Sequence, residues 1–314
     1  MPDLTTITPA PGGRLTPTTG KPARRANSMR AVERRAGLSL SGVAMLLFLI
    51  FWVIPLAATL ALSFTDYDLS GQPGWVGLHN YRRLVGSSEF WSSLKVTVLF
   101  TVLAVGPTLL LALLLALPLA RPGRASTAIR SVVFIPAVMP LVATALLWQV
   151  MYQSDGLADR FVSLFGIPPQ PWLSTPKLAV TSLLVMVIWK YVGLYVIIFV
   201  AGLQAIPGNL YEAASIDGAR TLRTFFLITV PQLRRTFLFV IIIGVTGAVQ
   251  AFVPAYLLTK GGPVDATQVL PLYLFHNAFL YSKFGYASAI AMVLLVMLLA
   301  FAGLQFRLVD EPED

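Results

Sequence analysis

The chain reads Pro207-Gly-Asn-Leu-Tyr-Glu-Ala-Ala-Ser-Ile-Asp-Gly-Ala-Arg-Thr-Leu-Arg-Thr-Phe-Phe-Leu-Ile-Thr-Val-Pro231 between two long apolar runs. Asn209 is a candidate helix N-cap, and Glu212 follows three residues later, where the acid of a capping box belongs. Ala213 and Ala214 favour helix propagation, and Gly218 favours a stop. The pattern predicts a short helix in a loop, with small side chains that let another protein's backbone approach closely.

The composition around this segment excludes a soluble enzyme. Of the 314 residues, 56% are hydrophobic and only 12% are charged, whereas soluble domains carry roughly 25% charged residues. Six apolar stretches reach the ~20 residues that a helix needs to cross a bilayer. They cover approximately residues 40–64, 95–120, 130–151, 178–203, 235–258 and 287–307. We expect an all-helical integral membrane protein with six transmembrane helices in one transmembrane domain, 39–308.

Basic residues set the predicted orientation. With the N-terminus inside, 15 Lys and Arg residues fall on the inner side and seven on the outer side, so both termini are expected in the cytoplasm. Residues 1–38 are interpreted as a basic, disordered arm and 309–314 as an acidic tail. The inner loop 204–236 contains the quoted segment. The bases lie in short clusters, so the net charge of +9 is not interpreted as nucleic-acid binding.

Few residues are available for catalysis or metal binding. The chain has no cysteine and only two histidines, His79 and His276, and neither lies in a zinc or catalytic-triad motif. No phosphate-binding loop of the type Gly-x4-Gly-Lys-Ser/Thr occurs. We therefore expect no metal, no bound cofactor and no ATPase site in this chain.

The quoted segment resembles the cytoplasmic signature of the permease subunits of bacterial ABC importers. That signature is Glu-Ala-Ala, three residues, Gly, nine residues, Ile, one residue, Leu-Pro. The matching positions here are Glu212-Ala213-Ala214, Gly218, Ile228 and Pro231, with Val230 in place of Leu. The resemblance implies the type I importer (MetI-like) permease fold in a bacterial cell membrane.

The resemblance also implies the partners. They are a second permease, two copies of an ATPase subunit that uses ATP and Mg, and an extracytoplasmic solute-binding protein. In the family this helix docks into a cleft of the ATPase and transmits its motion. The positions that this implies as coupling contacts are Glu212, Ala213, Ala214, Asp217, Gly218 and Arg220.

Three further stretches resemble the carbohydrate-uptake branch, which contains the maltose and glycerol-3-phosphate permeases. They are Gly77-Leu78-His79-Asn80-Tyr81, Leu258-Thr259-Lys260-Gly261-Gly262-Pro263 and Gly285-Tyr286-Ala287-Ser288-Ala289. They imply import of a sugar, an oligosaccharide or a related polyol.

The solute pathway is predicted from polar residues inside the spans. Lys190, beside Trp189, either contacts the solute or serves a structural role, because a charge in hydrocarbon is costly. Thr246 and Gln250 share a helical face near the rings of Phe252 and Tyr256, a set suited to sugar binding. Polar bonding between permease subunits is the alternative.

Three alternatives remain open. Lys190 would also suit a phosphorylated or anionic solute such as glycerol-3-phosphate, with the same architecture. An ion-coupled secondary transporter requires acids or histidines within spans, and no acid falls inside the six predicted spans. A membrane-bound enzyme requires a clustered polar catalytic set at one membrane face.

Overall fold

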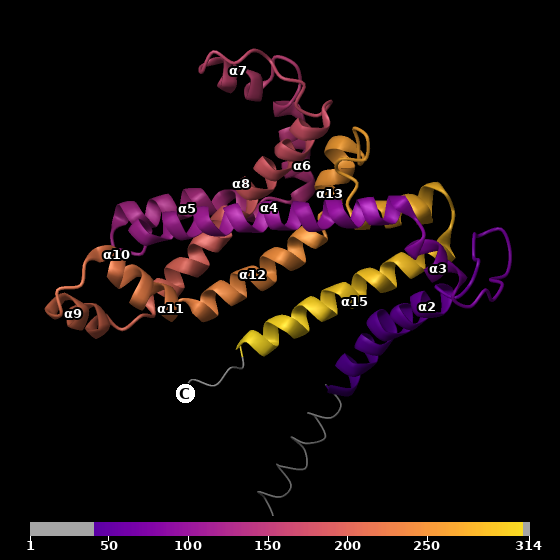
Figure 1. Ribbon diagram of the computed structural model, residues 1–314, viewed down its shortest axis with the longest axis horizontal. Helices are drawn as coiled ribbons and strands as arrows, with labels where there is room; N and C mark the ends of the chain where they lie inside the picture. The colour runs from indigo at the N-terminus through magenta and orange to yellow at the C-terminus, as the bar shows by residue number, and fades with distance from the viewer. Residues whose placement is uncertain (1–40, 310–314) are drawn as a thin grey trace, which may run out of the picture. The chain divides into compact units, whose positions relative to one another are not determined.

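The computed structural model describes residues 41–309 (Figure 1). The arm 1–38 and residues 310–314 of the tail lie outside this range. Of the described residues, 41–57 belong to one unit and 58–309 to another. The helices are η1 (Leu49–Val53), α2 (Ile54–Leu62), α3 (His79–Val85), α4 (Ser88–Leu119), α5 (Arg124–Val138), α6 (Leu141–Met151), α7 (Leu157–Ser163), α8 (Pro176–Gln204), α9 (Gly208–Ile216), α10 (Thr221–Thr224), η2 (Phe225–Thr229), α11 (Val230–Gln232), α12 (Arg234–Val249), α13 (Phe252–Pro254), η3 (Ala255–Thr259), α14 (Leu270–Phe275), η4 (His276–Leu280) and α15 (Phe284–Val309).

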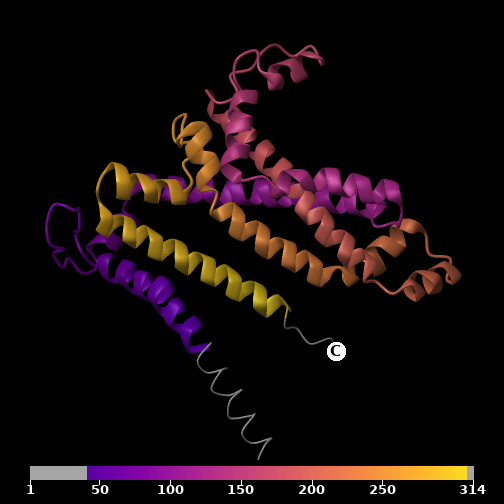
Figure 2. The ribbon, with the colours of Figure 1, turned by 180° about the vertical axis from the view of Figure 1, so that it is seen from behind.

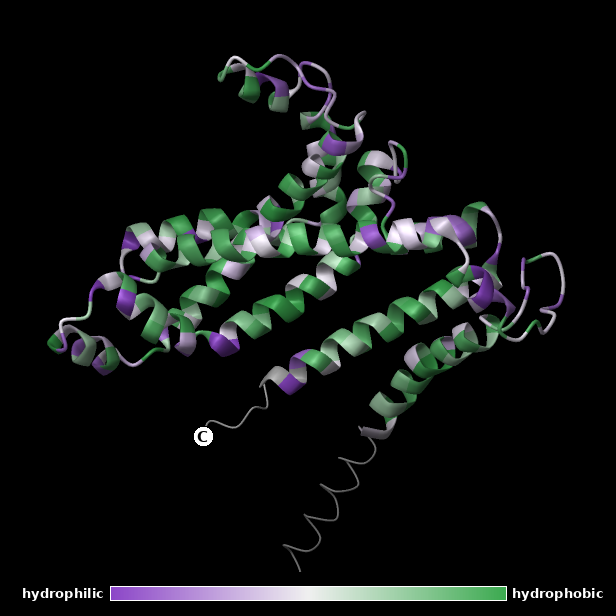
Figure 3. Cartoon of the chain, in the orientation of Figure 1, coloured by the Kyte–Doolittle hydropathy of each residue, from purple (hydrophilic) through white to green (hydrophobic). Residues whose placement is uncertain are grey.

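The spans agree with the apolar runs of the sequence. Five helical segments are long and apolar enough to cross a membrane, and the pair α5 and α6 makes a sixth if it counts as one span. The five are Ser41–Leu62, Ser88–Leu119, Pro176–Gln204, Arg234–Thr259 and Phe284–Gln305. Figure 3 shows that hydrophobic residues dominate these segments, whereas hydrophilic residues gather near the helix ends and in the loops. The all-helical membrane fold is confirmed.

The third predicted span, 130–151, is not one straight helix. It is bent by 96° between α5 and α6, at Met139 and Pro140. Met139 takes an extended conformation, with ψ of 141°, as expected for a residue that precedes proline. Proline also has no N–H with which to continue the helix.

The fifth span is interrupted as well. Helix α12 ends at Val249, and the helical path resumes at Phe252. The ring of Pro254 would meet the carbonyl of Gln250, four residues earlier, in a continuous helix. The interruption at Gln250 and Ala251 relieves this conflict.

Helix α8 is the centre of the second unit. Half of the residues in its most apolar stretch are buried, and it packs against α4, α5 and α12. Figure 2 shows the same arrangement of these helices from behind. At one end of the unit, Gln204 Nε2 of α8 donates to the carbonyl of Ala120, 3.0 Å away, just after α4. The functional segments are attached to the ends of this bundle.

The loop before α3 is held by a buried amide. Asn80 Nδ2 donates to the carbonyls of Ser63, at 3.0 Å, and Thr65, at 2.7 Å. Ser63 Oγ also lies 2.7 Å from the hydroxyl of Tyr81. The Gly77–Tyr81 stretch singled out in the sequence therefore ties the loop between the first two spans to the end of the first span.

Helices α5 and α8 approach closely at one glycine. A Cβ atom on Gly193 would lie only 1.9 Å from the carbonyl oxygen of Val133. Backbone atoms cannot rotate away as a side chain can, so the contact requires glycine. Gly193 therefore sets the distance between the two helices.

We expect Gly193→Ala to separate α5 from α8 and to lower the free energy of unfolding by about 1–3 kcal/mol, as overpacking commonly does. The measurement is the thermal midpoint of the purified chain in detergent. Gly106→Ala in α4 is the matched control, because nothing lies within 4 Å of its Cβ position. Equal midpoints for the two variants would contradict the close packing.

Candidate functional site

Helix α9 forms where the sequence predicts a loop helix, but its start differs. It begins at Gly208 after an extended Pro207, and no side chain caps it. The predicted capping box of Asn209 and Glu212 is therefore wrong. Asn209 lies inside the first turn, because the extended proline ends the preceding loop and the helix starts directly after it.

The end of α9 is as predicted at Gly218. This glycine has a φ of +68°, which costs a residue with a Cβ atom more than it costs glycine. Its N–H bonds to the carbonyl of Ser215, and the N–H of Ala219 bonds to that of Ala214. These two bonds form a Schellman motif, which satisfies the last carbonyls of the helix. Gly218 is therefore a structural stop.

The exposed face of α9 is partly as predicted. Glu212, Ala213, Asp217, Gly218 and Arg220 are exposed. All five remain available to a partner protein.

Ala214 differs from the other predicted contacts. Its exposed fraction is 8%, so it packs against its own chain and is not part of the exposed face. Ile216 was not predicted and is 87% exposed. The sequence carried a signal for this exposure. Residues two positions apart lie on different faces of a helix, so once Ala214 faces the protein, Ile216 faces away from it.

Helix α9 is linked to the segment that leads into α12. The hydroxyl of Tyr211 lies 3.1 Å from Thr229 Oγ1. Behind α9, a cavity of about 1030 Å³ opens between Tyr211, Ser215 and the end of α4 near Leu117. The helix therefore contacts the bundle through a few side chains instead of a fully packed face.

Lys190 serves the bent span. Its exposed fraction is 4%, and Nζ donates to the carbonyls of Pro136 (3.0 Å), Ala137 (3.4 Å) and Met139 (2.7 Å). Pro140 has no N–H with which to continue the helix. The carbonyl of Pro136 also accepts the N–H of Met139 at 3.3 Å, so the lysine adds a second donor there and supplies one to the carbonyls of Ala137 and Met139 at the helix end. Of the two predicted roles, the contacts favour the structural one.

The aromatic residues of the predicted pathway lie in the core. Trp189 meets Trp148 edge to face at 5.6 Å between ring centroids. Phe252 stacks on Tyr256 at 5.3 Å, and Phe275 contacts both rings. All three predicted rings are half-buried and pack against one hydrophobic cluster.

Gln250 is the one predicted pathway residue that lines a central cavity. The cavity has a volume of about 260 Å³, and α4, α6, α8 and α12 contribute to its walls. Tyr191 and Tyr195 supply two further polar groups in a mainly apolar lining. Thr246 is exposed and does not line this cavity. The structure thus separates the six predicted residues into different environments.

Comparison with known proteins finds membrane components of transport systems. A family model described as "Binding-protein-dependent transport system inner membrane component" matches residues 108–310. The trehalose/maltose transport system permease protein of Thermococcus litoralis is 35% identical, covering 81% of this chain and 86% of that protein. The lactose transport system permease protein of Rhizobium radiobacter is 33% identical, covering 84% and 90%.

A solved structure shares the fold. It is a chain of a bacterial ABC transporter that imports the acidic polysaccharide alginate. The TM-score is 0.75 at 22% identity, and the match covers 90% of this chain and 99% of that one.

The role of Lys190 is testable by removing its charge. Lys190→Met removes the Nζ donor that three backbone carbonyls at the bend share, and it is expected to lower the free energy of unfolding by about 1–3 kcal/mol. The thermal midpoint of the purified chain measures the loss. Lys177→Met, an exposed lysine of the same helix, is the control. An unchanged midpoint combined with lost transport would instead favour a solute-binding role.

Proposed function

Because the chain belongs to the family of binding-protein-dependent transport system inner membrane components, we propose that it works as follows. It is the permease subunit of an importer that moves a carbohydrate into the cytoplasm, and separate ATPase subunits drive it through α9. A second permease and an extracytoplasmic solute-binding protein complete the assembly. The exposed surface of α9, with Glu212 and Ile216 beside the Gly218 stop, is the observation that carries the coupling step.

The proposed carbohydrate substrate is supported by relatives that are named as permeases for sugars or sugar derivatives. Curated relatives are named for trehalose/maltose, lactose, sulfoquinovosyl glycerol and arabinooligosaccharides. They share 29–35% identity with this chain across 81–87% of its length. This range of sugars supports the substrate class and leaves the individual sugar open.

The geometry of α9 supports its role as the coupling element. It is short, stopped by a Schellman motif, and carries exposed groups on one side. Tyr211 joins it to Thr229, a few residues before α12 begins at Arg234. A movement imposed on α9 by an ATPase would therefore reach α12, whose far end contributes Gln250 to the central cavity.

A second permease is supported by the exposed polar groups of the fifth span. Thr246 and Gln250 are both exposed in this chain. Facing lipid, their polar groups would have no water or protein partner. A second subunit, or a water-filled path between the two subunits, would supply hydrogen-bond partners for Thr246 and Gln250. Either arrangement is compatible with the two predicted roles, solute binding and polar bonding between permease subunits.

The anionic alternative loses its main residue. Lys190, which would have bound a phosphate or carboxylate, donates to backbone carbonyls instead. The secondary-transporter alternative is also weak. Within the described spans, the only acid is Glu89, in the first turn of α4.

We expect Glu212→Ala and Gly218→Ala to abolish uptake while the chain still inserts into the membrane. The first removes the acid of the docking face. The second strains a residue at φ +68° and displaces the end of α9. Sugar uptake by whole cells and the amount of chain in isolated membranes are the two measurements.

Gly208→Ala is the matched control for this experiment. It lies at the start of the same helix, and nothing lies within 4 Å of its Cβ position. Uptake close to the unmodified level is expected for it. Normal transport by both Glu212→Ala and Gly218→Ala would reject coupling through α9.

A further inference from the structure

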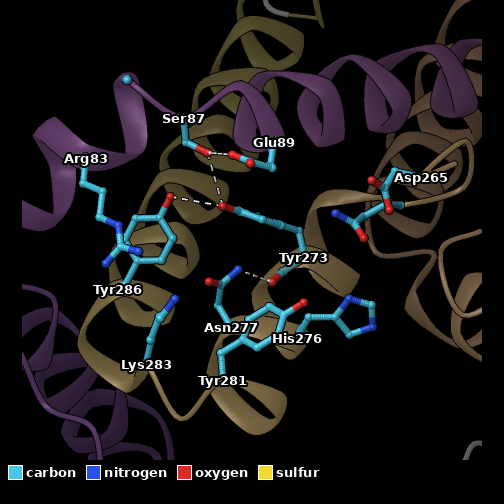
Figure 4. A pocket seen from close by; sticks show the side chains of 12 residues that line it. Arg83, Ser87, Glu89, Asp265, Tyr273, His276, Asn277, Tyr281, Lys283 and Tyr286 are labelled. Atoms are coloured by element: carbon cyan, nitrogen blue, oxygen red, sulfur yellow. Dashed lines mark hydrogen bonds between the residues drawn. The ribbon is translucent and has the colours of Figure 1, made fainter.

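A polar pocket lies at the end of α4 opposite α9. It is formed where α3 and the start of α4 meet α14, η4 and the start of α15 (Figures 1 and 4). If α9 docks an ATPase in the cytoplasm, this end of the bundle is extracytoplasmic. The pocket therefore lies at the entrance of the pathway, at the other end of α4 from the coupling helix.

The lining of this pocket differs from the rest of the protein. Its volume is about 470 Å³, within the roughly 300–1,000 Å³ typical of small-molecule sites. Apart from one glycine, every lining residue has a side chain that can donate or accept hydrogen bonds, and four of them, Arg83, Glu89, Asp265 and Lys283, carry charge. This lining is far more polar than the chain as a whole, which is 56% hydrophobic.

Buried hydroxyl groups form one wall. Ser87 Oγ donates to a carboxylate oxygen of Glu89 at 2.8 Å and lies 3.3 Å from the hydroxyl of Tyr273. That hydroxyl lies 3.2 Å from the hydroxyl of Tyr286, and both tyrosines are buried. Figure 4 shows these bonds as a continuous chain of dashed lines. The wall is thus a prearranged row of donors and acceptors.

The surrounding loop is held by further hydrogen bonds. Thr267 Oγ1 donates to the carbonyl of Gly262 at 2.9 Å and lies 2.6 Å from Thr259 Oγ1. This network fixes the turn that carries Asp265 and Gln268 to the pocket. Prearranged polar groups lower the ordering cost of binding a ligand.

The charges of the pocket balance. Arg83 and Lys283 contribute two positive charges, and Glu89 and Asp265 contribute two negative ones. Burial lowers the pKa of His276 below its usual value, although Asp265 opposes the shift, so this imidazole is neutral at pH 7. A site for an anion would carry an excess of positive charge. The balance favours a neutral ligand with many hydroxyl groups.

We propose that this pocket is an entry site for a neutral sugar. Hydroxyl groups of the sugar would bond to the carboxylate of Glu89 and to polar side chains such as Gln268. Lys283 Nζ lies over the ring of Tyr281, 5.4 Å from its centroid, but the residue is still 59% exposed, so the rest of the ring offers a surface for the apolar face of a sugar ring. His276 and Asn277 thereby belong to a binding site. The proposal rests on the proposed import of carbohydrate.

Uptake is measured in the protein's own cells, with each variant placed in the chromosomal gene so that all partners are present. The probes are trehalose, maltose and lactose, with glycerol-3-phosphate as the anion. Tyr281→Ala is expected to raise the half-saturating sugar concentration about three- to tenfold, which corresponds to the loss of one aromatic or hydrogen-bonded contact. Phe165→Ala, an exposed ring outside the pocket, is expected to leave it unchanged.

A pair of charge variants tests the neutrality of the ligand. Glu89→Gln and Lys283→Met change the pocket charge in opposite directions and are both expected to weaken a neutral sugar. With an anionic ligand, Glu89→Gln would strengthen binding and Lys283→Met would weaken it, and that outcome overturns the proposal. Lys177→Met, outside the pocket, controls for the loss of a lysine.

Direct binding separates this site from a protein contact. The purified full chain in lipid nanodiscs is titrated with the sugar that its cells import, and saturation-transfer NMR reports binding. A signal that Tyr281→Ala weakens supports the site. If uptake responds to the variants but the chain binds no sugar, the pocket contacts a partner protein and the proposal is wrong.

The two levels of the proposal fail differently. If deletion of the gene leaves the uptake of every carbohydrate that the cells import unchanged, the proposed import of carbohydrate fails. If deletion abolishes uptake of one sugar but the Tyr281, Glu89 and Lys283 variants match the unmodified protein, import stands and the entry site fails.

Discussion

The donation from Lys190 to the carbonyls that end α5 is the interaction on which the arrangement of the spans depends. Hydrocarbon supplies no donors, so a broken helix persists in a membrane only where protein or water satisfies the freed carbonyls. The bend at Pro140 creates this requirement, and Lys190 meets it from the central helix. Gly193, one turn away on α8, allows the close approach. The bent span and the central helix therefore act as one structural element.

This arrangement explains how the chain can be rigid in one place and movable in another. The bend is fixed by several backbone contacts, whereas α9 is joined to the bundle through Tyr211 and the buried Ala214 and backs onto a cavity. A force applied to α9 meets less resistance there than it would against a packed helix face. The chain runs from Thr229, which Tyr211 contacts, directly into α12. Helix α12 ends at a break beside the central cavity.

Local sequence patterns predicted most of the fold because hydropathy and helix stops are local properties. The apolar runs marked the spans, and Gly218 marked the end of α9. The sequence did not reveal which face of α9 is exposed, because this depends on the rotation of the helix against the bundle. Ala214, a predicted contact, is buried, and Ile216, for which no role was predicted, is exposed. The role of Lys190, solute contact or structure, also depends on contacts that the local sequence does not show. Its partners lie more than 50 residues earlier, and no local pattern connects them.

The polar pocket at the other end could not be read from the sequence either, because its walls combine residues near 83–89 with residues near 265–286. Its balanced charges and the shielded Lys190 both favour a neutral solute over an anion. A pathway for an anion needs a positive group that the solute can reach, yet Lys190, in the middle of its span, donates to backbone carbonyls. The charges at the pocket are matched by acids. What remains along the path are hydroxyl, amide and aromatic groups, which suit a neutral polyhydroxylated solute.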